Sequence, residues 1–494
     1  MATNALQIDT RDRAVRILHI ASEAVPWAKT GGLADVVGAL CGHLAAAGHD
    51  VTLALPLYRA VAAAGVALDG PPVTVALEGR TVDIRTAESE AGFRVWFVDA
   101  PDLFDREGLY GEAGVDYPDN ADRFATFVRA VLAGVSDLGP VPDIIHSHDW
   151  QGALAPVYLE SGDRLSGEPD PATVLTVHNL AYQGVYPARV AAAAGVPDVE
   201  AVRQGDSVGF LKGGLLSADQ VTTVSSRYAR EIATPVLGFG LDPWIADLEP
   251  PVLGILNGID TSVWNPAADP YLAATYDATD LTGKATCKRA LQAEMGLALE
   301  SDVPLFGMVS RLVGQKGLSL IADLGDELVE REAQFVFLGT GEARYEELVA
   351  DLAARHPNVA ARLAFSEELA HRIEAGADFF LMPSRFEPCG LNQMISQRYG
   401  TPPVVHRVGG LADSVTHASP GALAEGEATG VVFDQFDAPS LSRAVDFARD
   451  LYGDGERIAA VRRAGMQRDF SWRRSGLEYE ALYRRVLEVK HGAA

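Results

Sequence analysis

Residues 305–317 read Leu-Phe-Gly-Met-Val-Ser-Arg-Leu-Val-Gly-Gln-Lys-Gly, an apolar run that ends in a basic, glycine-containing loop. A short continuous apolar run is typical of a strand buried on both faces, as in a parallel sheet covered by helices. Similar runs, separated by alanine- and leucine-rich helical stretches, occur on both sides of it. They include Ala14–Ala21, Val51–Leu55, Asp143–His148, Val174–His178, Val221–Ser225, Phe335–Gly339, Asp378–Ser384 and Pro403–Val408. The pattern predicts an α/β protein with doubly wound parallel sheets.

The length of the chain predicts more than one domain, because 494 residues exceed what a single hydrophobic core usually holds. Between the two series of runs, residues 257–302 are rich in Pro, Asp, Ala and Thr and contain one helical pattern, near Lys288–Met295. We therefore expect an N-terminal Rossmann-like domain over 1–256 and a C-terminal one over 257–471. The remaining residues, 472–494, contain an amphipathic helix from Trp472 to Val489, which we expect to pack back on the first domain.

The charge balance limits the class of partner. Lys and Arg number 41 against 67 Asp and Glu, a net charge of −26, which argues against nucleic acid and anionic membranes. No stretch has the roughly 20 apolar residues of a membrane span. The three cysteines form no Cys-x-x-Cys pair, and the N-terminus has no apolar signal region. We expect a cytoplasmic protein without disulfides or structural zinc.

In so acidic a chain, basic residues that bind an anionic substrate should be locally concentrated. Lys29-Thr30-Gly31-Gly32 lies between a predicted strand and a helix, where free backbone N–H groups and the helix dipole favour an anion. Arg311 and Lys316 follow another strand, and together they suit a diphosphate. The alternative for the loop at Lys29 is an ordinary turn with an exposed lysine. The alternative for Arg311 and Lys316 is a solvated pair at the surface.

Residues 383–393, Pro-Ser-Arg-Phe-Glu-Pro-Cys-Gly-Leu-Asn-Gln, form a second candidate loop between a strand and a helix. Pro388 and Gly390 predict a sharp turn, after which Leu391 and Asn392 offer amides at a helix start. Glu387, at the mouth of the turn, is suited to bind sugar hydroxyls or to stabilise a cationic centre. The alternative for Glu387 is a helix-capping acid, and Cys389 is most simply a small packed residue.

Polar residues end two further predicted strands: His178-Asn179, and Asp149 after His146-Ser147-His148. They suit the lining of a sugar pocket better than a metal site, because no glutamate or cysteine nearby completes a ligand set. His178 alone is equally compatible with a core histidine. Gly339-Thr340-Gly341-Glu342 lacks the third glycine of a dinucleotide fingerprint and is weak evidence for NAD.

One internal repeat links the two halves: Gly31-Gly32-Leu33-Ala34-Asp35 recurs at residues 409–413. Chance in a chain rich in glycine and alanine is one explanation. The other is that both sheets present a glycine loop at the carboxyl ends of their strands, where such sheets bind ligands. Two such edges facing each other would form one cleft.

Taken together, these motifs resemble bacterial glycogen synthase and plant starch synthase, the retaining glucosyltransferases of GT-B fold with two Rossmann-like domains. The resemblance runs in the family's order from Lys29-Thr-Gly-Gly-Leu through His148-Asp-Trp, Val177-His-Asn-Leu, Asn257-Gly-Ile-Asp and Ser310-Arg-Leu to Glu387-Pro-Cys-Gly-Leu. It implies transfer of glucose from ADP-glucose to the non-reducing end of an α-1,4-glucan such as glycogen. It also implies retained anomeric configuration and neither a metal nor another cofactor.

The resemblance also assigns roles. Arg311 and Lys316 would neutralise the leaving diphosphate with help from the Gly31 and Gly32 amides, and Lys29 would lie beside the same phosphates. Glu387 would bind the donor sugar, with the amides of Cys389 and Gly390. His178 would contact the glucose near its 6-hydroxyl. Further positions implied to line the substrates are Asp35, Asp149, Asn179, Asn257, Leu391, Asn392, where relatives often have Thr, and Phe365, where relatives often have a Tyr that stacks on adenine.

Other functions remain open at this point. A close alternative uses the same donor with a small acceptor such as glucose 1-phosphate. A non-catalytic glucan-binding protein would have no need of the diphosphate-binding cations, and an NAD oxidoreductase would need a better fingerprint. UDP-glucose is an alternative donor. Retention is compatible either with an adduct on Glu387 or with attack on the face that the leaving group departs from. Closure about a hinge near residue 257 would exclude water from the reaction.

Overall fold

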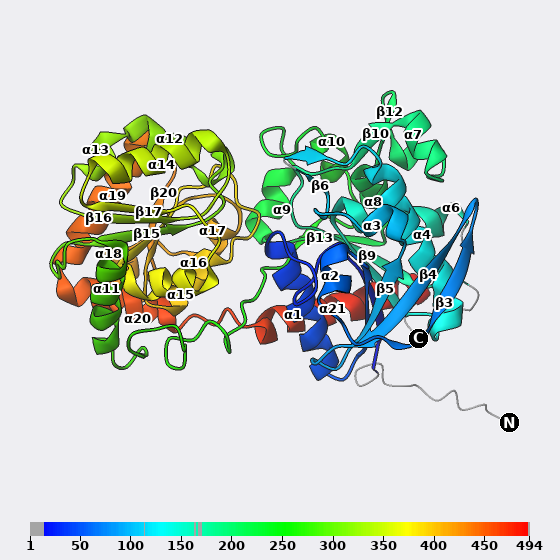
Figure 1. The fold of residues 1–494 in the computed structure, drawn as a ribbon, viewed down its shortest axis with the longest axis horizontal. Coiled ribbons are helices and arrows are strands. Elements are labelled where there is room, and N and C mark those ends of the chain that lie inside the picture. Colours follow the sequence, from blue (N-terminus) through cyan, green and yellow to red (C-terminus); the bar gives the residue numbers. More distant parts are fainter. Residues whose placement is uncertain (1–13, 113, 163–164, 166–169, 493–494) are drawn as a thin grey trace. The chain divides into compact units, whose positions relative to one another are not determined.

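The computed structural model describes residues 14–112, 114–162, 165 and 170–492, and its contacts divide the chain into two compact units (Figure 1). The N-terminal domain holds the chain up to Val224, Ala229–Ile255 and the stretch that begins at Trp472. The C-terminal domain holds Leu256–Ser471 and the short piece Ser225–Tyr228. The chain therefore leaves the N-terminal domain after Ile255 and returns to it at Trp472.

Within the described residues, the N-terminal domain is built on a nine-stranded sheet. In spatial order its strands are β14 (Leu253–Gly254), β13 (Gln220–Thr223), β9 (Ala172–Val177), β8 (Ile144–His148), β1 (Arg16–Ile20), β2 (Asp50–Pro56), β5 (Arg94–Asp99), β4 (Arg80–Glu88) and β3 (Asp69–Leu77). Neighbours from β14 to β5 run parallel, whereas β4 and β3 form an antiparallel edge. The parallel strands are almost wholly buried, as their continuous apolar sequences require.

The helices and small strands of this domain fill the connections. The helices are α1 (Gly32–Ala46), α2 (Arg59–Ala63), α3 (Pro101–Phe104), α4 (Asn120–Leu138), α5 (Asp149–Gly152), α6 (Leu154–Ser161), α7 (Ala188–Ala193), η1 (Glu200–Val202), α8 (Phe210–Ser217), α9 (Ser226–Ile232), which begins in the piece grouped with the other domain, α10 (Asp242–Ala246) and α21 (Trp472–His491). The small strands are β6 (Gly111–Glu112), β7 (Val115–Asp116), β10 (Val185–Pro187), β11 (Arg203–Gln204) and β12 (Ser207–Gly209).

The C-terminal domain contains, in the part of the chain that the structure describes, a six-stranded sheet in which every pairing is parallel. Its order is β17 (Val359–Arg362), β16 (Gln334–Leu338), β15 (Leu305–Val309), β18 (Phe379–Met382), β19 (Pro403–His406) and β20 (Val431–Phe433). The connecting helices are α11 (Thr282–Met295), η2 (Gly314–Lys316), α12 (Leu318–Leu324), α13 (Asp326–Val329), α14 (Ala343–Arg355), α15 (Glu367–Gly376), α16 (Asn392–Arg398), α17 (Gly409–Ser414), α18 (Pro420–Glu425), α19 (Ala438–Gly453) and α20 (Gly455–Met466).

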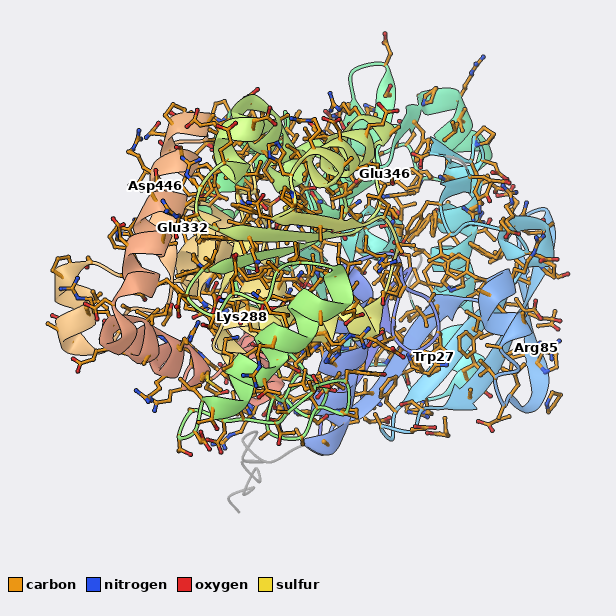
Figure 2. The ribbon with its side chains drawn as sticks, turned by 60° about the vertical axis from the view of Figure 1, so that its left-hand side comes forward. Trp27, Arg85, Lys288, Glu332, Glu346 and Asp446 are labelled. Carbon is orange, nitrogen blue, oxygen red and sulfur yellow. The ribbon has the colours of Figure 1, made fainter. Side chains whose placement is uncertain are left out.

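Helices cover both faces of this sheet (Figure 1) and enclose two apolar clusters. One cluster joins α12, α14 and α19 to the strands, and the other joins α11 and α15 to them. A buried ion pair adds to the second side: Nζ of Lys288, which Figure 2 labels on α11, lies 2.7 Å from Oδ2 of Asp378 at the start of β18. Asp378 also pairs with Arg462, whose Nη2 lies 2.6 Å from its Oδ1, so removing Asp378 would leave both cations without this partner and would be costly.

The helix α21 packs on the N-terminal domain, against α1 and β9. Its buried side chains recur at intervals of three and four residues, as on one helix face, and include Trp472, Tyr479, Tyr483 and Val486. A Cβ on Gly476 would lie 2.0 Å from the ring of His43 in α1, so the two helices approach closely at this glycine. Among the described residues, no helix is both long and apolar enough to cross a membrane.

Each sheet has a point at which the winding of the chain reverses. In the N-terminal sheet, β1 lies between β2 and β8; in the C-terminal sheet, β15 lies between β16 and β18. The loops at the carboxyl ends of strands on either side of such a point leave a crevice, which is where open α/β sheets bind ligands. These two places hold most of the candidate site residues.

Candidate active site

Asp149 joins the ends of two strands in the N-terminal domain. It directly follows β8 and is held at a φ of 51°, an uncommon conformation for a residue with a side chain. Its Oδ1 accepts the backbone N–H groups of His178 (2.7 Å) and Asn179 (3.3 Å), the two residues that follow β9. Burial raises the pKa of the Asp149 carboxyl to about 7, and the nearby charge of Glu23 adds to the increase. Asp149, His178 and Asn179 therefore form one structural unit.

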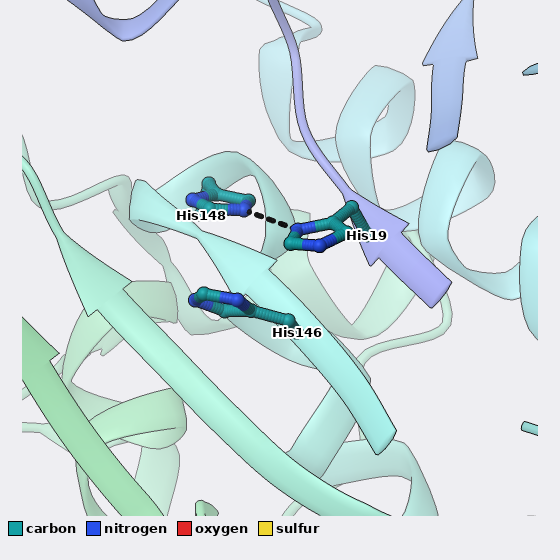
Figure 3. A group of neighbouring side chains, drawn as sticks. All are labelled: His19, His146 and His148. Carbon is teal, nitrogen blue, oxygen red and sulfur yellow. Dashed lines mark hydrogen bonds between the residues drawn. The ribbon is translucent and has the colours of Figure 1, made fainter. Parts of the chain in front are cut away.

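Buried histidines extend from this unit toward β1. Nε2 of His178 lies 3.0 Å from Nδ1 of His148, and Nε2 of His148 lies 3.0 Å from Nδ1 of His19, the contact drawn in Figure 3. Burial lowers the pKa values of His19 and His178 to about 3 and that of His148 well below its ordinary value. These imidazoles are therefore neutral at physiological pH.

The ring nitrogens of His19, His146 and His148 lie within 4.8 Å of one another, close enough to consider a metal site. The ring of His146 is already engaged at both nitrogens, by the Tyr483 hydroxyl (2.8 Å) and by Oγ1 of Thr176 (2.6 Å). A metal would have to displace those bonds and break the contact between His19 and His148. The cluster fits a hydrogen-bonded core better than a cation site.

The Lys-Thr-Gly-Gly loop before α1 is organised around Glu23, a residue that was not among the predicted site residues. The buried Glu23 carboxylate accepts the N–H and hydroxyl of Thr30, the N–H of Gly31 (3.3 Å) and the Tyr110 hydroxyl (2.5 Å). We expected the Gly31 amide to help bind phosphate; in this structure it donates to a carboxylate of the protein itself. A substrate anion would have to compete with Glu23 for that N–H.

The other predicted residues of this loop lie at the surface. Nζ of Lys29 is 2.7 Å from Oδ1 of Asp35, and both side chains are well exposed. Gly32 is the first residue of α1, and Asp35 lies in its first turn. An exposed pair of this kind is a weak interaction, which leaves Lys29 able to exchange its partner for a phosphate.

Lys316 and Glu387 meet at the switch point of the C-terminal sheet. Lys316 ends η2, after β15, and its Nζ lies 2.6 Å from Oε2 of Glu387 in the loop after β18. Ser384 donates its hydroxyl to the same oxygen at 3.0 Å, and Glu387 is buried. Arg311 is exposed, and within the described ranges its side chain forms no ion pair. The arrangement places two cations at the strand ends, one of them fixed by an acid.

The turn that carries Glu387 is built on close backbone approaches. Gly390 has a φ of 71°, and the N–H of Gly410 donates to the carbonyl oxygens of Glu387 and Pro388, both at 3.1 Å. Leu391 occupies the N-cap position of α16 without a side-chain capping bond, and Nδ2 of Asn392 donates to the Val309 carbonyl (2.8 Å), which ties this turn to the end of β15.

Cys389 lies inside the same turn. Burial raises the pKa of its thiol to about 12, although a hydrogen bond with Asn257 opposes the shift, so the thiol is neutral. Asn257 is itself buried, and its side-chain oxygen has no hydrogen-bond partner in the described part of the chain. This oxygen is a free acceptor beside the turn, which suits a sugar hydroxyl.

Two further predicted loops lie in this domain. Phe365 follows β17, and its side chain is 85% exposed, so one face of the ring is accessible for stacking. In the turn Gly339–Glu342, the Gly339 N–H donates to the Arg362 carbonyl (3.2 Å) and the Glu342 N–H to the Leu312 carbonyl (2.9 Å). The Gly341 N–H donates to the carboxylate of Glu346 (2.7 Å), which Figure 2 labels. With its amides engaged in this way, the turn does not resemble a dinucleotide-binding loop.

Both domains match known protein families. Residues 16–247 match the starch synthase catalytic domain family, and residues 295–459 match glycosyl transferases group 1. The chain is 48% identical to the glycogen synthase of Anaeromyxobacter dehalogenans, over 95% of this chain and 99% of the relative. It is 44% identical to that of Syntrophotalea carbinolica, over 97% and 100%.

Among solved structures, the catalytic domain of starch synthase IV from Arabidopsis thaliana, bound to ADP and acarbose, superposes with a TM-score of 0.87. It is 34% identical, and the match covers 96% of this chain and 100% of that one. A sucrose-phosphate synthase from Thermosynechococcus elongatus, 18% identical with a TM-score of 0.62 over 96% and 99% of the two chains, shares the fold alone. The fold is that of the GT-B glycosyltransferases, and the chain belongs to the family of glycogen synthases and starch synthases.

Proposed function

We propose that the chain transfers glucose from ADP-glucose to the non-reducing end of an α-1,4-glucan, with retention of the anomeric configuration. The observation that carries the proposal is the Lys316–Glu387 pair at the switch point of the C-terminal sheet. It occurs in a chain 34% identical to a starch synthase whose structure holds ADP and acarbose. A nucleotide and a glucan-like oligosaccharide are the two ligands that the reaction requires.

The donor side of the reaction rests on the C-terminal domain. The bond between glucose C1 and the diphosphate oxygen breaks, and its electron pair stays on the diphosphate. The 4-hydroxyl oxygen of the acceptor glucan bonds to C1 in its place, and the proton of that hydroxyl passes to the departing diphosphate. The charge of Lys316, together with that of the exposed Arg311, would stabilise the negative charge that develops there, in a role often performed by a metal ion. We propose that turnover therefore requires no divalent cation and no other cofactor.

The acceptor side rests on the N-terminal domain. Neutral His178 and the backbone around Asp149 offer hydrogen bonds to sugar hydroxyls, and a carboxyl with a pKa of about 7 can gain or lose a proton near neutral pH. In the other domain, one oxygen of Glu387 already accepts from both Lys316 and Ser384. Such bonds weaken a carboxylate as a nucleophile, which favours attack on the leaving group's face over an adduct on Glu387.

The test measures nucleotide release by the purified full-length chain, with ADP-glucose or UDP-glucose, each with and without glycogen and with EDTA. We expect ADP release that depends on glycogen, persists in EDTA and falls about 10²–10³-fold in Lys316→Ala. Turnover of the donor with glucose 1-phosphate but not with glycogen would identify a small acceptor. No release under any condition would refute the enzymatic function.

We also propose a cytoplasmic location. Cys41, Cys287 and Cys389 are all free and buried. Unpaired cysteines are usual in a reducing compartment, where disulfides rarely persist.

A further inference from the structure

Three imidazoles form a continuous hydrogen-bonded chain beneath the acceptor-side residues. The chain begins at His19 in β1, passes through His148 at the end of β8 and ends at His178 after β9, with both N···N distances at 3.0 Å (Figure 3 shows the first contact). All three side chains are buried. Each contact joins an Nδ1 to an Nε2, so the three rings must orient their protons in one common direction.

Because burial keeps the three rings neutral, each carries one N–H, and only two proton patterns satisfy both contacts. In the outward pattern, Nδ1–H of His19 donates to His148 and Nδ1–H of His148 donates to His178. In the inward pattern, every donor is an Nε2–H and the direction is reversed. The outward pattern leaves His178 with an N–H at Nδ1, and the inward pattern leaves it with a bare acceptor there.

The environment of His19, at the inner end of the three rings, distinguishes the two proton patterns. Nε2 of His19 is buried and has no hydrogen-bond partner among the described residues. The inward pattern would place an N–H at this atom, and the outward pattern leaves a lone pair. Buried N–H groups without a partner are rarer than unpaired acceptors, so the outward pattern is the more stable one.

We propose that His19 and His148 are positioning residues that hold His178 as its Nδ1–H tautomer, so that His178 donates a hydrogen bond to a hydroxyl of the bound sugar. No other group in the described part of the chain hydrogen-bonds to Nδ1 of His178, so this atom is available to a ligand. That the ligand is a sugar rests on the proposed function; the tautomer itself does not.

The three hydrogen-bonded rings fix the direction in which their N–H groups donate, and they do not conduct protons. A proton relay needs an outlet at both ends, and Nε2 of His19 has neither solvent nor a partner. The role of His19 is therefore to fix which nitrogen of His148 carries the proton. Through His148, it also fixes which nitrogen of His178 carries the proton, although His178 lies 159 residues further along the sequence.

His146 provides a matched control. Its ring is equally buried and lies 4.9 Å from that of His19 and 4.3 Å from that of His148, measured between centroids. Its own hydrogen bonds run to Tyr483 and Thr176, outside the chain of three. Substituting His146 disturbs the same core without touching the proton order of His178.

The first experiment reads the tautomer directly, by ¹⁵N NMR of the full-length chain labelled at its 11 histidines, with the His178 signal identified by its loss in His178→Gln. We expect Nδ1–H at His178 in the wild type and in His146→Leu, and a shift toward Nε2–H in His19→Leu. An Nε2–H form in the wild type, or no change in His19→Leu, would overturn the proposal. Because no substrate is present, this result stands apart from the proposed function.

The second experiment measures transfer. We expect His148→Leu to lower kcat about tenfold, the worth of one hydrogen bond. His148→Asn, whose amide is placed near the Nδ1 position, should recover most of that loss, and His146→Leu should stay within about twofold of the wild type. In a His178→Ala background, His148→Leu should have no further effect. A full tenfold loss in that background would show that His148 acts only through packing and would overturn the proposal.

Discussion

The two copies of Gly-Gly-Leu-Ala-Asp begin helices in different domains but use their glycines in opposite ways. At residues 31–35 the motif opens the long helix α1, and a Cβ added to Gly31 would meet nothing within 4 Å. At residues 409–413 it opens the short helix α17, where a Cβ on Gly409 would lie 1.9 Å from the Glu387 carbonyl oxygen. A Cβ on Gly410 would lie 2.0 Å from that of Cys389.

The same five residues therefore leave the backbone accessible in one domain and allow close backbone packing in the other. We call these two uses access and support. Gly31 leaves open space above its backbone, whereas Gly409 and Gly410 let one backbone pack directly against the turn that carries Glu387. The Lys–acid pairs differ in the same sense, since Lys29–Asp35 is exposed and Lys316–Glu387 is largely buried. The internal repeat therefore does not mark two equivalent anion loops.

The largest effect is expected from Glu387→Gln, which removes the charge that fixes Lys316 while keeping the shape of the side chain. We expect the rate of ADP release with glycogen to fall about 10²–10³-fold, because preorganised charge at the reacting centre is lost. Steady-state kinetics measures it, with circular dichroism to verify the fold. A decrease of less than about tenfold would mean that the buried pair is structural.

The next effect tests the glycines themselves. Gly410→Ala should lower the free energy of unfolding by about 3 kcal/mol, because its Cβ would overlap backbone that cannot move independently. Gly31→Ala, at an extended φ of −158° with open space around it, should change that free energy by less than about 0.5 kcal/mol. Urea denaturation compares them. Equal losses in the two variants would contradict the division into access and support.

A third prediction concerns pH and the N-terminal domain. Burial raises the pKa of Asp149 to about 7, against about 3.9 in an unfolded chain, so the folded state binds the proton more tightly. The resulting stabilisation is fully present below about pH 4, declines as the pH rises and is lost above about pH 7. Relative to Asp149→Asn, the wild type should therefore lose unfolding free energy across that window. A difference that is constant from pH 4 to 8 would disprove the shift.

The smallest effect is expected from Asp35→Asn, which breaks the exposed pair with Lys29. An exposed ion pair contributes little, so the free energy of unfolding should change by less than about 0.5 kcal/mol. Thermal unfolding at low and high salt provides the measurement. A loss comparable to that in Gly410→Ala would show that the first copy of the motif also supports the fold.

Much of the fold was predictable, because buried parallel strands are written as continuous apolar runs. The runs at Leu305–Ser310 and Asp143–His148 contain β15 and β8. The antiparallel edge formed by β3 and β4 was not predicted, since those strands are partly exposed and their sequences carry no such run.

For the candidate site, the sequence predicted which residues follow the ends of strands, but it did not predict which of those residues contact one another. Glycine and basic residues after a strand pointed to Lys316 and Glu387, but their 2.6 Å contact spans 71 residues of sequence. Glu23 follows β1 and could have been noticed for that reason, whereas nothing marked Tyr110 as its partner. His19 and His148 are 129 residues apart, and a sequence pattern does not state which rings touch. Contacts of this kind are set by tertiary packing.

The return of α21 to the N-terminal domain has a consequence for biosynthesis. The hydroxyl of Tyr483 completes the hydrogen bonds of His146 beneath the sheet, and Nζ of Lys490 lies 2.9 Å from Asp219. Because Leu256–Ser471 is translated before this helix, the N-terminal domain receives its last helix only after the whole C-terminal domain has been synthesised. Until then its sheet lacks part of its cover, so the nascent N-terminal half should depend on chaperones while the C-terminal domain folds.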